Sequence, residues 1–306
     1  MNALSGRPQG KGAGPVGDAA RKRAQTSVSE NTRRSYEAAL RGFERSGRPE
    51  TDAGVAAYLG DLLGEGRTAA VAAMAVAALR FRAGLDERLS PVGPETERAL
   101  DMFRRLDTGR GYGRVAGVSW EEADRACELA ESAGDIAGLR DAAIVAVASD
   151  ALLRVSEIEA LDVVDINLTD QTLLIRRFGT DKDDAGVVQL IGEPTAARAR
   201  AWLEAAALAE GALFRPLFKS GRLRKGRLTR RSIRNIIIRR ARDAGVQGRI
   251  SGHSLRVGSA QSLAAAGASL VEMQLAGRWR SPVMPVRYAQ EELGGGGAVA
   301  RLRYGR

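Results

Sequence analysis

The chain has 306 residues, 44% of them hydrophobic, and this length can bury one large core or two medium ones. Its 47 Lys and Arg outnumber 37 Asp and Glu, so the net charge is +10 and nucleic acid is the first partner to expect. The single cysteine, Cys127, excludes an intrachain disulfide and a multi-cysteine zinc site, while the lack of a secretion signal or a membrane-length apolar run predicts a cytoplasmic protein.

The N-terminal third predicts a small helical domain between two irregular segments. Residues 1–24 are glycine-rich, basic and without periodicity, which is typical of a disordered tail. Residues 25–107 contain four or five short stretches with helical apolar spacing; the first begins at a good N-cap, Ser29, and an alanine-rich one can start at Thr68. Residues 108–117, TGRGYGRVAG, contain four glycines and predict an interdomain linker.

A second domain is predicted from residue 118 to 306, with a C-terminal tail from about residue 291. Ser119 has capping-box spacing to a glutamate and predicts the start of a helix. Residues 171–191 alternate like a β-hairpin with a tight loop around Lys182. Most of the remaining stretches have helical spacing, so the predicted fold class is mainly α with a small antiparallel β-sheet.

Basic side chains are concentrated in one part of this domain. Between Arg215 and Arg256 the chain has 14 Lys and Arg and one acidic residue, Asp243. A surface with that composition repels itself unless phosphates or counterions lie nearby. A run of charge is usually a solvated face, but this one leads directly into the His253 motif, so the basic helix predicted after Thr229 is expected to lie along DNA.

Two short stretches carry polar residues typical of an active site. His253, the only histidine, lies three residues before Arg256 in ISGHSLRVGSA, at the start of a predicted helix whose N-terminus suits a phosphate. In ALLRVSEIEAL, Arg154 lies among apolar residues, where a guanidinium is costly to bury unless it meets an anion. Glu157 in the same stretch is expected to orient Arg154 rather than to act as a base.

Together with a lysine in the hairpin and an aromatic pair downstream, these motifs resemble the tyrosine recombinases, the phage integrase family. The stretch SGHSLRVGSA…AGRWRSPVMPVRYAQ is most similar to the Cre recombinase branch, which has tryptophan where most relatives have histidine. The ordered set spans about 135 residues and is far more specific than any single motif, and the resemblance covers roughly residues 25–290. The catalytic residues that it implies are Arg154, Lys182, His253, Arg256, Trp279 and Tyr288.

The resemblance implies a covalent mechanism in which Tyr288 is the nucleophile. Its phenol would attack a DNA phosphodiester, form a 3′-phosphotyrosine and release a 5′-hydroxyl, and the site could reseal the strand without ATP, metal or another cofactor. Arg154 and Arg256 would bind the non-bridging oxygens as negative charge builds up. Tyr304, which follows a run of four glycines, is the less favoured alternative nucleophile.

The other three residues would bind the phosphate and move protons. His253 would hydrogen-bond the phosphate and help to take the tyrosine proton, and Trp279 would donate its indole N–H. Lys182 would protonate the leaving 5′-oxygen. Three aspartates crowd Lys182, and Lys219 or Lys225 could serve instead.

The family also implies partners. The N-terminal domain would be a SAM-like core-binding domain that closes with the catalytic domain as a clamp on double-stranded DNA, and four protomers would synapse two sites. The tail from about residue 291 could dock on a neighbouring protomer. No membrane partner is expected, and the location in the cell would be nucleoid-associated. The sequence does not show whether accessory proteins bend the DNA. Arg278 is expected to be a surface charge. The expected DNA-contacting residues are Arg33, Arg34, Arg230, Arg231 and Arg234.

Three other functions account for part of the sequence. A type IB topoisomerase uses a similar set of residues without synapsis of two sites. A non-catalytic DNA-binding protein would leave the intact set of six residues without a purpose, and an RNA-binding helical protein would leave Tyr288 and His253 unexplained. Integration, excision, dimer resolution and transposition are equally compatible with the motifs.

Overall fold

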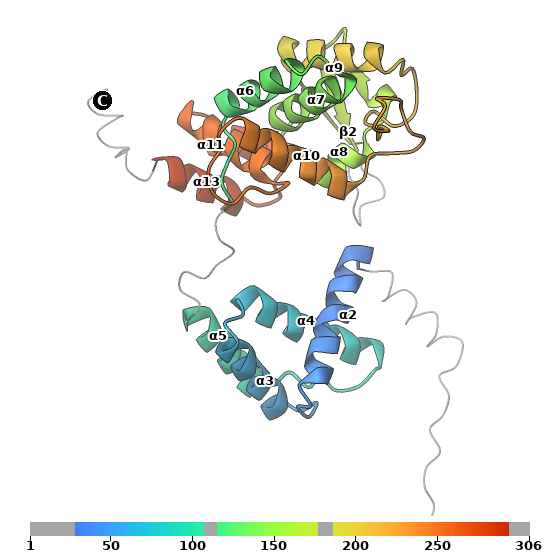
Figure 1. Cartoon of the computed structure of the whole chain (residues 1–306). Coiled ribbons are helices and arrows are strands. Elements are labelled where there is room, and N and C mark those ends of the chain that lie inside the picture. The colour runs from blue at the N-terminus through green and yellow to red at the C-terminus, as the bar shows by residue number, and fades with distance from the viewer. Residues whose placement is uncertain (1–27, 107–114, 177–185, 294–306) are drawn as a thin grey trace, which may run out of the picture. The chain divides into compact units, whose positions relative to one another are not determined.

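The chain forms two compact units, Met1–Gly113 and Arg114–Arg306 (Figure 1). The boundary between them lies within the segment 108–117 that is expected to be a linker. The expected basic tail of residues 1–24 and the loop around Lys182 lie outside the part of the chain that the structure describes. The structure is a computed structural model that describes residues 28–106, 115–176 and 186–293, with the backbone alone for 291–293.

All the regular secondary structure in the described part of the first unit is helical. Its helices are α2 (Glu30–Arg45), α3 (Asp52–Gly64), α4 (Ala69–Leu85) and α5 (Pro94–Leu106). The Ser29 side chain accepts a hydrogen bond from a backbone N–H at the start of α2, and α4 begins directly after Thr68, as the sequence predicts. Helix α2 packs against α4 and α3 against α5, around a core that includes Phe43 and Leu79.

The second unit combines helices with one small sheet. Its helices are α6 (Trp120–Glu131), α7 (Ile136–Asp150), α8 (Val155–Ala160), the 3-10 helix η1 (Val163–Asp165), α9 (Glu193–Ala205), α10 (Arg230–Asp243), α11 (Ser254–Ala265), α12 (Leu270–Ala276) and α13 (Val283–Leu293). Its strands are β1 (Ile166–Asn167), β2 (Thr172–Ile175) and β3 (Val187–Leu190). They pair antiparallel in the order β1-β2-β3, and β2 and β3 are the predicted hairpin. The mainly α fold with a small antiparallel sheet is therefore confirmed, whereas β1, α12 and α13 were not predicted.

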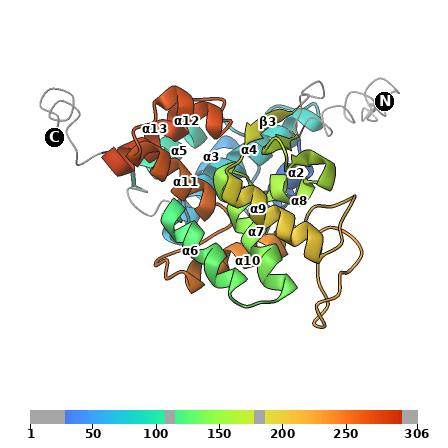
Figure 2. The same cartoon turned by 90° about the horizontal axis from the view of Figure 1, so that it is seen from above.

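Helix α7 lies at the centre of the second unit, with α6, α9, α10 and α11 packed against it (Figures 1 and 2). Ile144 and Val147 are fully buried, and each such aliphatic side chain stabilises the fold by roughly 1.5–3 kcal/mol. The carboxylate of Asp141 in the same helix is also fully buried, and it pairs with Arg239 and Arg240 of α10 at 2.5 and 3.0 Å. Because a buried charge must be neutralised, these pairs tie the basic helix to the core.

Candidate active site

Two helix ends shape the site, and both close on a residue with a left-handed backbone. Leu152 follows α7 with φ 46°, and Arg278 follows α12 with φ 53°. In each turn the next backbone N–H donates to the carbonyl five residues earlier, at 3.0 Å, which is the Schellman arrangement. At each turn the chain leaves the helix. Arg154 comes two residues after Leu152, and Trp279 comes directly after Arg278.

Arg154 lies immediately before α8 and is held by Glu157. One oxygen of the Glu157 carboxylate accepts the Arg154 backbone N–H at 2.8 Å, and the other accepts the Arg154 guanidinium at 2.6 Å. The nearby guanidiniums and the backbone hydrogen bond outweigh the cost of burial, so the pKa of Glu157 lies below its ordinary value. Glu157 is therefore ionised at neutral pH and orients Arg154, whose side chain is 39% exposed and open to an incoming anion.

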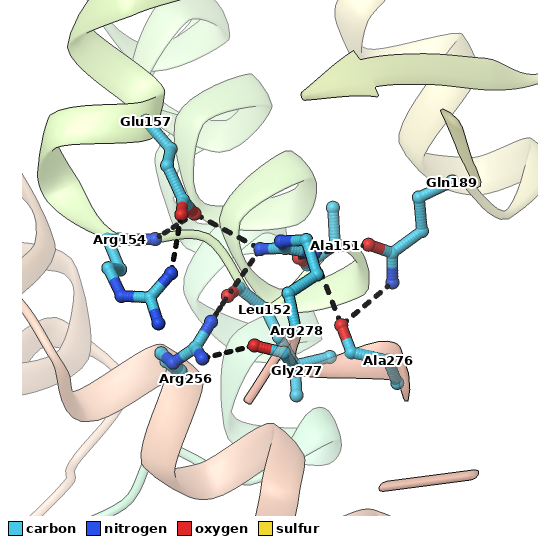
Figure 3. A network of polar contacts seen from close by, with 9 residues as sticks. All are labelled: Ala151, Leu152, Arg154, Glu157, Gln189, Arg256, Ala276, Gly277 and Arg278. Atoms are coloured by element: carbon cyan, nitrogen blue, oxygen red, sulfur yellow. Dashed lines mark hydrogen bonds and ion pairs between the residues drawn. The ribbon is translucent and has the colours of Figure 1, made fainter. Parts of the chain in front are cut away.

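Arg256 is buried in the site, with 3% of its surface exposed. Its guanidinium donates to the carbonyls of Leu152 and Gly277, at the ends of α7 and α12 (Figure 3). It also lies 4.5 Å from the centroid of the Trp279 ring. Burial and then the charge of Arg154 lower the pKa of Arg256 to about 10. The side chain stays protonated at neutral pH, in an orientation fixed by three neighbours.

His253 lies at the N-cap of α11, three residues before Arg256. The sequence predicts both residues on one face of the helix, but the structure buries Arg256 and leaves His253 exposed, because the N-cap residue lies outside the helical turn. Although the imidazole remains accessible, packing on one side and then the charges of Arg256 and Arg154 lower the pKa of His253 below its ordinary value. Neutral imidazole therefore predominates at neutral pH and can accept a proton.

Trp279 and Tyr288 form an aromatic pair between the α12 turn and α13. Their ring centroids are 5.7 Å apart at an interplanar angle of 46°, and both rings are half-buried against the cluster that includes Met273. The Trp279 ring folds back over Gly277, where an added Cβ would lie 1.9 Å from a ring carbon. Glycine is therefore required at Gly277 for the indole to lie beneath Arg256.

Arg278 is not surface charge, and the expectation from the sequence is wrong. Its side chain is 3% exposed, and its guanidinium donates to the Glu157 carboxylate at 3.1 Å and to the Leu152 carbonyl at 3.1 Å. The sequence did not indicate that Arg278 is buried, because an isolated arginine between glycine and tryptophan resembles a charged residue on an exposed loop. The available signal was its place directly after a helix, where glycine is the usual residue.

The site thus gathers five of the six expected catalytic residues in one unit. Lys182 lies outside the described residues, as does the alternative nucleophile Tyr304. Lys219 and Lys225 are exposed on the segment between α9 and α10, which lies away from α13 in both views (Figures 1 and 2). Within the described ranges, no cluster of His, Cys, Asp and Glu could hold a metal ion.

The basic stretch between Arg215 and Arg256 has less unneutralised positive charge than its composition suggests. Arg227 pairs with Asp162 at 2.7 Å and Arg230 with Glu159 at 2.5 Å, so acids from an earlier part of the chain neutralise them. Of the described residues, none forms an ion pair with the exposed Arg231. Arg231 and Arg234 are both exposed on α10, as are Arg230, Arg239 and Arg242 of the same helix.

Arg234 lies next to the active site. The Cβ and Cγ atoms of Arg234 would both lie 3.6 Å from a Cβ added to Gly252, the residue before His253. In the first unit, Arg33 and Arg34 are exposed on α2 and pair with Glu30 at 2.6 and 3.1 Å. Exposed pairs of this kind stabilise little and leave both arginines accessible.

The chemical character of the site is that of an anion site beside a phenol. Two guanidiniums, those of Arg154 and Arg278, bind the carboxylate of Glu157, and the third, that of Arg256, interacts with it electrostatically (Figure 3). The phenol of Tyr288 and the Arg256 guanidinium interact electrostatically. Such a cluster suits a tetrahedral oxyanion that is attacked by the phenol.

Comparison with known proteins agrees with this geometry. The chain is 24% identical over 293 residues to an integrase/recombinase xerD homolog of Selenomonas ruminantium, covering 89% of this chain and 85% of that protein. It is 26% identical over 232 residues to the recombinase Cre of Escherichia phage P1, covering 68% of each.

Among the helices that the structure describes, none is long and apolar enough to cross a membrane.

Solved structures share the fold at low sequence identity. The Tn1549 transposon integrase is 15% identical with a TM-score of 0.63, over 88% of this chain and 92% of that one. A lambda integrase is 17% identical with a TM-score of 0.58, over 89% and 75%. The family model for the phage integrase family matches residues 119–293, more than half of the chain and the whole of the described site. The chain therefore belongs to the phage integrase family and is a tyrosine-type site-specific recombinase.

Proposed function

We propose that this recombinase cleaves DNA by attack of the Tyr288 phenol oxygen on a phosphodiester phosphorus. The bond between phosphorus and the 5′-oxygen breaks, a 3′-phosphotyrosine forms, His253 accepts the phenol proton, and a lysine donates a proton to the leaving 5′-oxygen. Attack by a 5′-hydroxyl on the phosphotyrosine reverses each of these changes. The bond energy is conserved, so religation needs no ATP.

The observation that carries this proposal is the buried, fixed guanidinium of Arg256. Two main-chain carbonyls and the Trp279 ring hold it, while Arg154 is held by Glu157 and open to solvent. Donors that are fixed before the reaction stabilise developing negative charge without reorganisation, and each is worth roughly 3–4 kcal/mol in the transition state. The indole N–H of Trp279 is the proposed third donor to the phosphate.

The proposed donor to the leaving oxygen is Lys182, on the loop between β2 and β3. Lys219 and Lys225 are the alternatives. If Lys182→Ala cleaves an intact duplex at a near-normal rate, the donor is another lysine. A substrate with a 5′-bridging phosphorothiolate, whose leaving thiolate needs no proton, separates loss of this proton donor from loss of folding.

The test of the proposal is to trap the covalent adduct and map the tyrosine that carries it. The protein is mixed with nicked suicide duplexes tiled across the DNA that flanks its own gene, and SDS-resistant adducts are digested with nuclease and trypsin. Cleavage after Arg287 and Arg303 places Tyr288 and Tyr304 on different peptides. Phosphate on the Tyr288 peptide is expected; phosphate on the Tyr304 peptide, or DNA binding without any adduct, contradicts the proposal.

The pH dependence of cleavage is expected to report His253. Because the pKa of His253 is lowered from its ordinary 6.5, the neutral base persists at neutral pH and the rate decreases only as the pH falls below about 6.5. The pKa of Glu157 lies below 4.5, so its protonation occurs at a lower pH. Single-turnover rates of His253→Gln should be about 100-fold lower and lack the decrease that wild type shows below pH 6.5. The same decrease in the variant would assign it to another group.

We propose double-stranded DNA as the partner of both units, with the first unit as the core-binding domain. The lambda integrase structure holds a dimer bound to a core site, and the Tn1549 integrase structure holds transposon right-end DNA, which supports this partner. Contacts from Arg33 and Arg34 of the first unit, and from the exposed arginines of α10, would neutralise phosphates. A nucleoid-associated location follows from such binding.

Arg231→Ala and Arg234→Ala are each expected to weaken DNA binding more at low salt than at high salt. Each loss of a phosphate contact should lower the slope of log affinity against log salt concentration by about one. Fluorescence anisotropy at several salt concentrations measures this slope. Arg200→Ala is the matched control, because Arg200 lies on α9 with a side chain that is 43% exposed. An unchanged slope in both α10 variants would remove this helix from the DNA interface.

We propose that the active assembly is a tetramer that synapses two DNA sites and exchanges strands through a Holliday junction. Cleavage and relaxation without synapsis, as in type IB topoisomerases, is the alternative. A plasmid that carries two copies of the mapped site distinguishes them, because recombination yields rearranged products and relaxation does not. Docking of the C-terminal tail on a neighbour concerns residues outside the described part and stays a prediction.

A further inference from the structure

Arg278 occupies a backbone position that favours glycine, yet it carries a long, buried and charged side chain. Its φ is 53°, at the left-handed position of the turn that ends α12, and its side chain is 3% exposed. Left-handed backbone is unfavourable for residues with a Cβ, and burial of a charge is costly. A residue that departs from both local rules points to a function of its side chain.

The Arg278 guanidinium connects three segments that are far apart in the sequence (Figure 3). One nitrogen donates to the Ala151 carbonyl at the end of α7 and to the Gln189 side chain on β3, at 2.9 and 2.5 Å. The same nitrogen lies 3.1 Å from the Ala276 carbonyl of α12. The Gln189 amide in turn donates to the Ala276 carbonyl at 3.4 Å, so β3 and α12 are joined twice.

The second guanidinium nitrogen of Arg278 reaches the groups that hold the two other arginines. It donates to the Glu157 carboxylate at 3.1 Å, and Glu157 also binds Arg154. It donates to the Leu152 carbonyl at 3.1 Å, and this carbonyl also accepts Arg256. Arg278 thus shares one acceptor with each of the two arginines proposed to bind the phosphate.

These contacts go beyond what is needed to end a helix. A capping role requires the carbonyls of α12 alone, such as that of Ala276. The contacts with Glu157 and Gln189 instead fix the α7–α8 turn and the β2–β3 hairpin relative to the turn that leads into Trp279 and the helix of Tyr288. Hydrogen bonds from a charged donor are strong and directional, so they hold these segments in one arrangement.

We propose that Arg278 is a positioning residue of the recombination site: it holds Glu157, and through it Arg154, in register with the segment that carries Trp279 and Tyr288. This inference rests on the proposed function of Tyr288 as the nucleophile. Arg278 does not touch the DNA in this role. Its loss should therefore slow cleavage without an equal loss of DNA affinity.

The experiment compares Arg278→Gly, Arg278→Lys and wild type in single-turnover cleavage of the mapped suicide duplex, with the affinity for the same duplex measured separately. Glycine suits the left-handed backbone, so Arg278→Gly removes the side chain alone. We expect its cleavage rate to be about 10- to 100-fold lower and its DNA affinity to stay within about threefold. Arg278→Lys keeps the positive charge but not the two-nitrogen fork of the guanidinium, so its cleavage rate should lie between those of wild type and Arg278→Gly. Ala207→Gly is the matched control, because Ala207 also has a left-handed backbone, with φ 48°, and should cleave normally.

A double-mutant cycle with Glu157→Gln tests whether Arg278 acts through Glu157. If it does, the combined variant should be little slower than the slower single variant, because both changes break one linkage. A wild-type rate in Arg278→Gly, losses that multiply in the double variant, or an equal loss of rate and DNA affinity would each overturn the inference. If Arg278→Gly does not melt cooperatively, Arg278→Lys takes its place in the cycle. Absence of an adduct in wild type would instead refute the proposed function.

Discussion

Replacement of Tyr288 by phenylalanine is expected to abolish the covalent adduct and all strand cleavage. The variant lacks the one oxygen that would bond to phosphorus, so the rate should decrease at least about 10⁴-fold, the scale seen when a nucleophile is removed. The ring packs against Trp279 at 5.7 Å, and phenylalanine can keep this contact. DNA affinity and thermal stability should therefore change little, and SDS gels with parallel binding assays measure both effects.

Tyr304→Phe is the matched control for this prediction. It makes the same change of one hydroxyl in the alternative nucleophile and should leave the adduct intact. An adduct that survives Tyr288→Phe and disappears in Tyr304→Phe would reverse the assignment. An adduct that survives in both variants would place the nucleophile on another residue.

Arg256→Met is expected to have the second largest effect, a decrease of about 10²- to 10³-fold in the single-turnover cleavage rate. Methionine fills a similar volume without a charge, so the donor that is fixed over Trp279 and against two helix-end carbonyls is lost. Arg256→Lys should remain at least about tenfold slower than wild type, because an ammonium cannot make the forked contact.

The control for Arg256 is Arg200→Met, the same change on the half-exposed face of α9. It should cleave at the wild-type rate. Thermal melting of Arg256→Met is measured in parallel, since the carbonyls of Leu152 and Gly277 each lose a charged donor. If the variant is folded and cleaves within about threefold of wild type, Arg256 does not stabilise the transition state and the proposed mechanism is wrong.

Local features of the fold were predictable from the sequence because they depend on neighbouring residues. The Ser29 cap, the helix that begins after Thr68 and the Ser119 capping box each involve groups within four positions. The β2–β3 hairpin was visible in alternation over residues 171–191. The short β1 strand was not predicted, because two residues carry too little periodicity for a pattern.

The environment of each charged residue was not predictable in this way. The run of basic residues near α10 indicated a surface that repels itself, but Arg239 pairs with Asp141, 98 positions earlier in the chain. Arg278 looked like surface charge, yet it is enclosed by α7, β3 and α12. Which charges are neutralised depends on partners that packing alone brings together.

The sequence by itself determined the types, order and spacing of the reactive residues, from Arg154 to Tyr288, and the helices and hairpin that carry them. Tertiary structure decided which of these side chains are buried, which carboxylate serves two arginines, and that His253 is exposed while Arg256 is enclosed. The reason is physical. Caps and apolar periods are local interactions along the chain, whereas the ionisation and orientation of a guanidinium depend on burial and on partners that only the packed fold supplies.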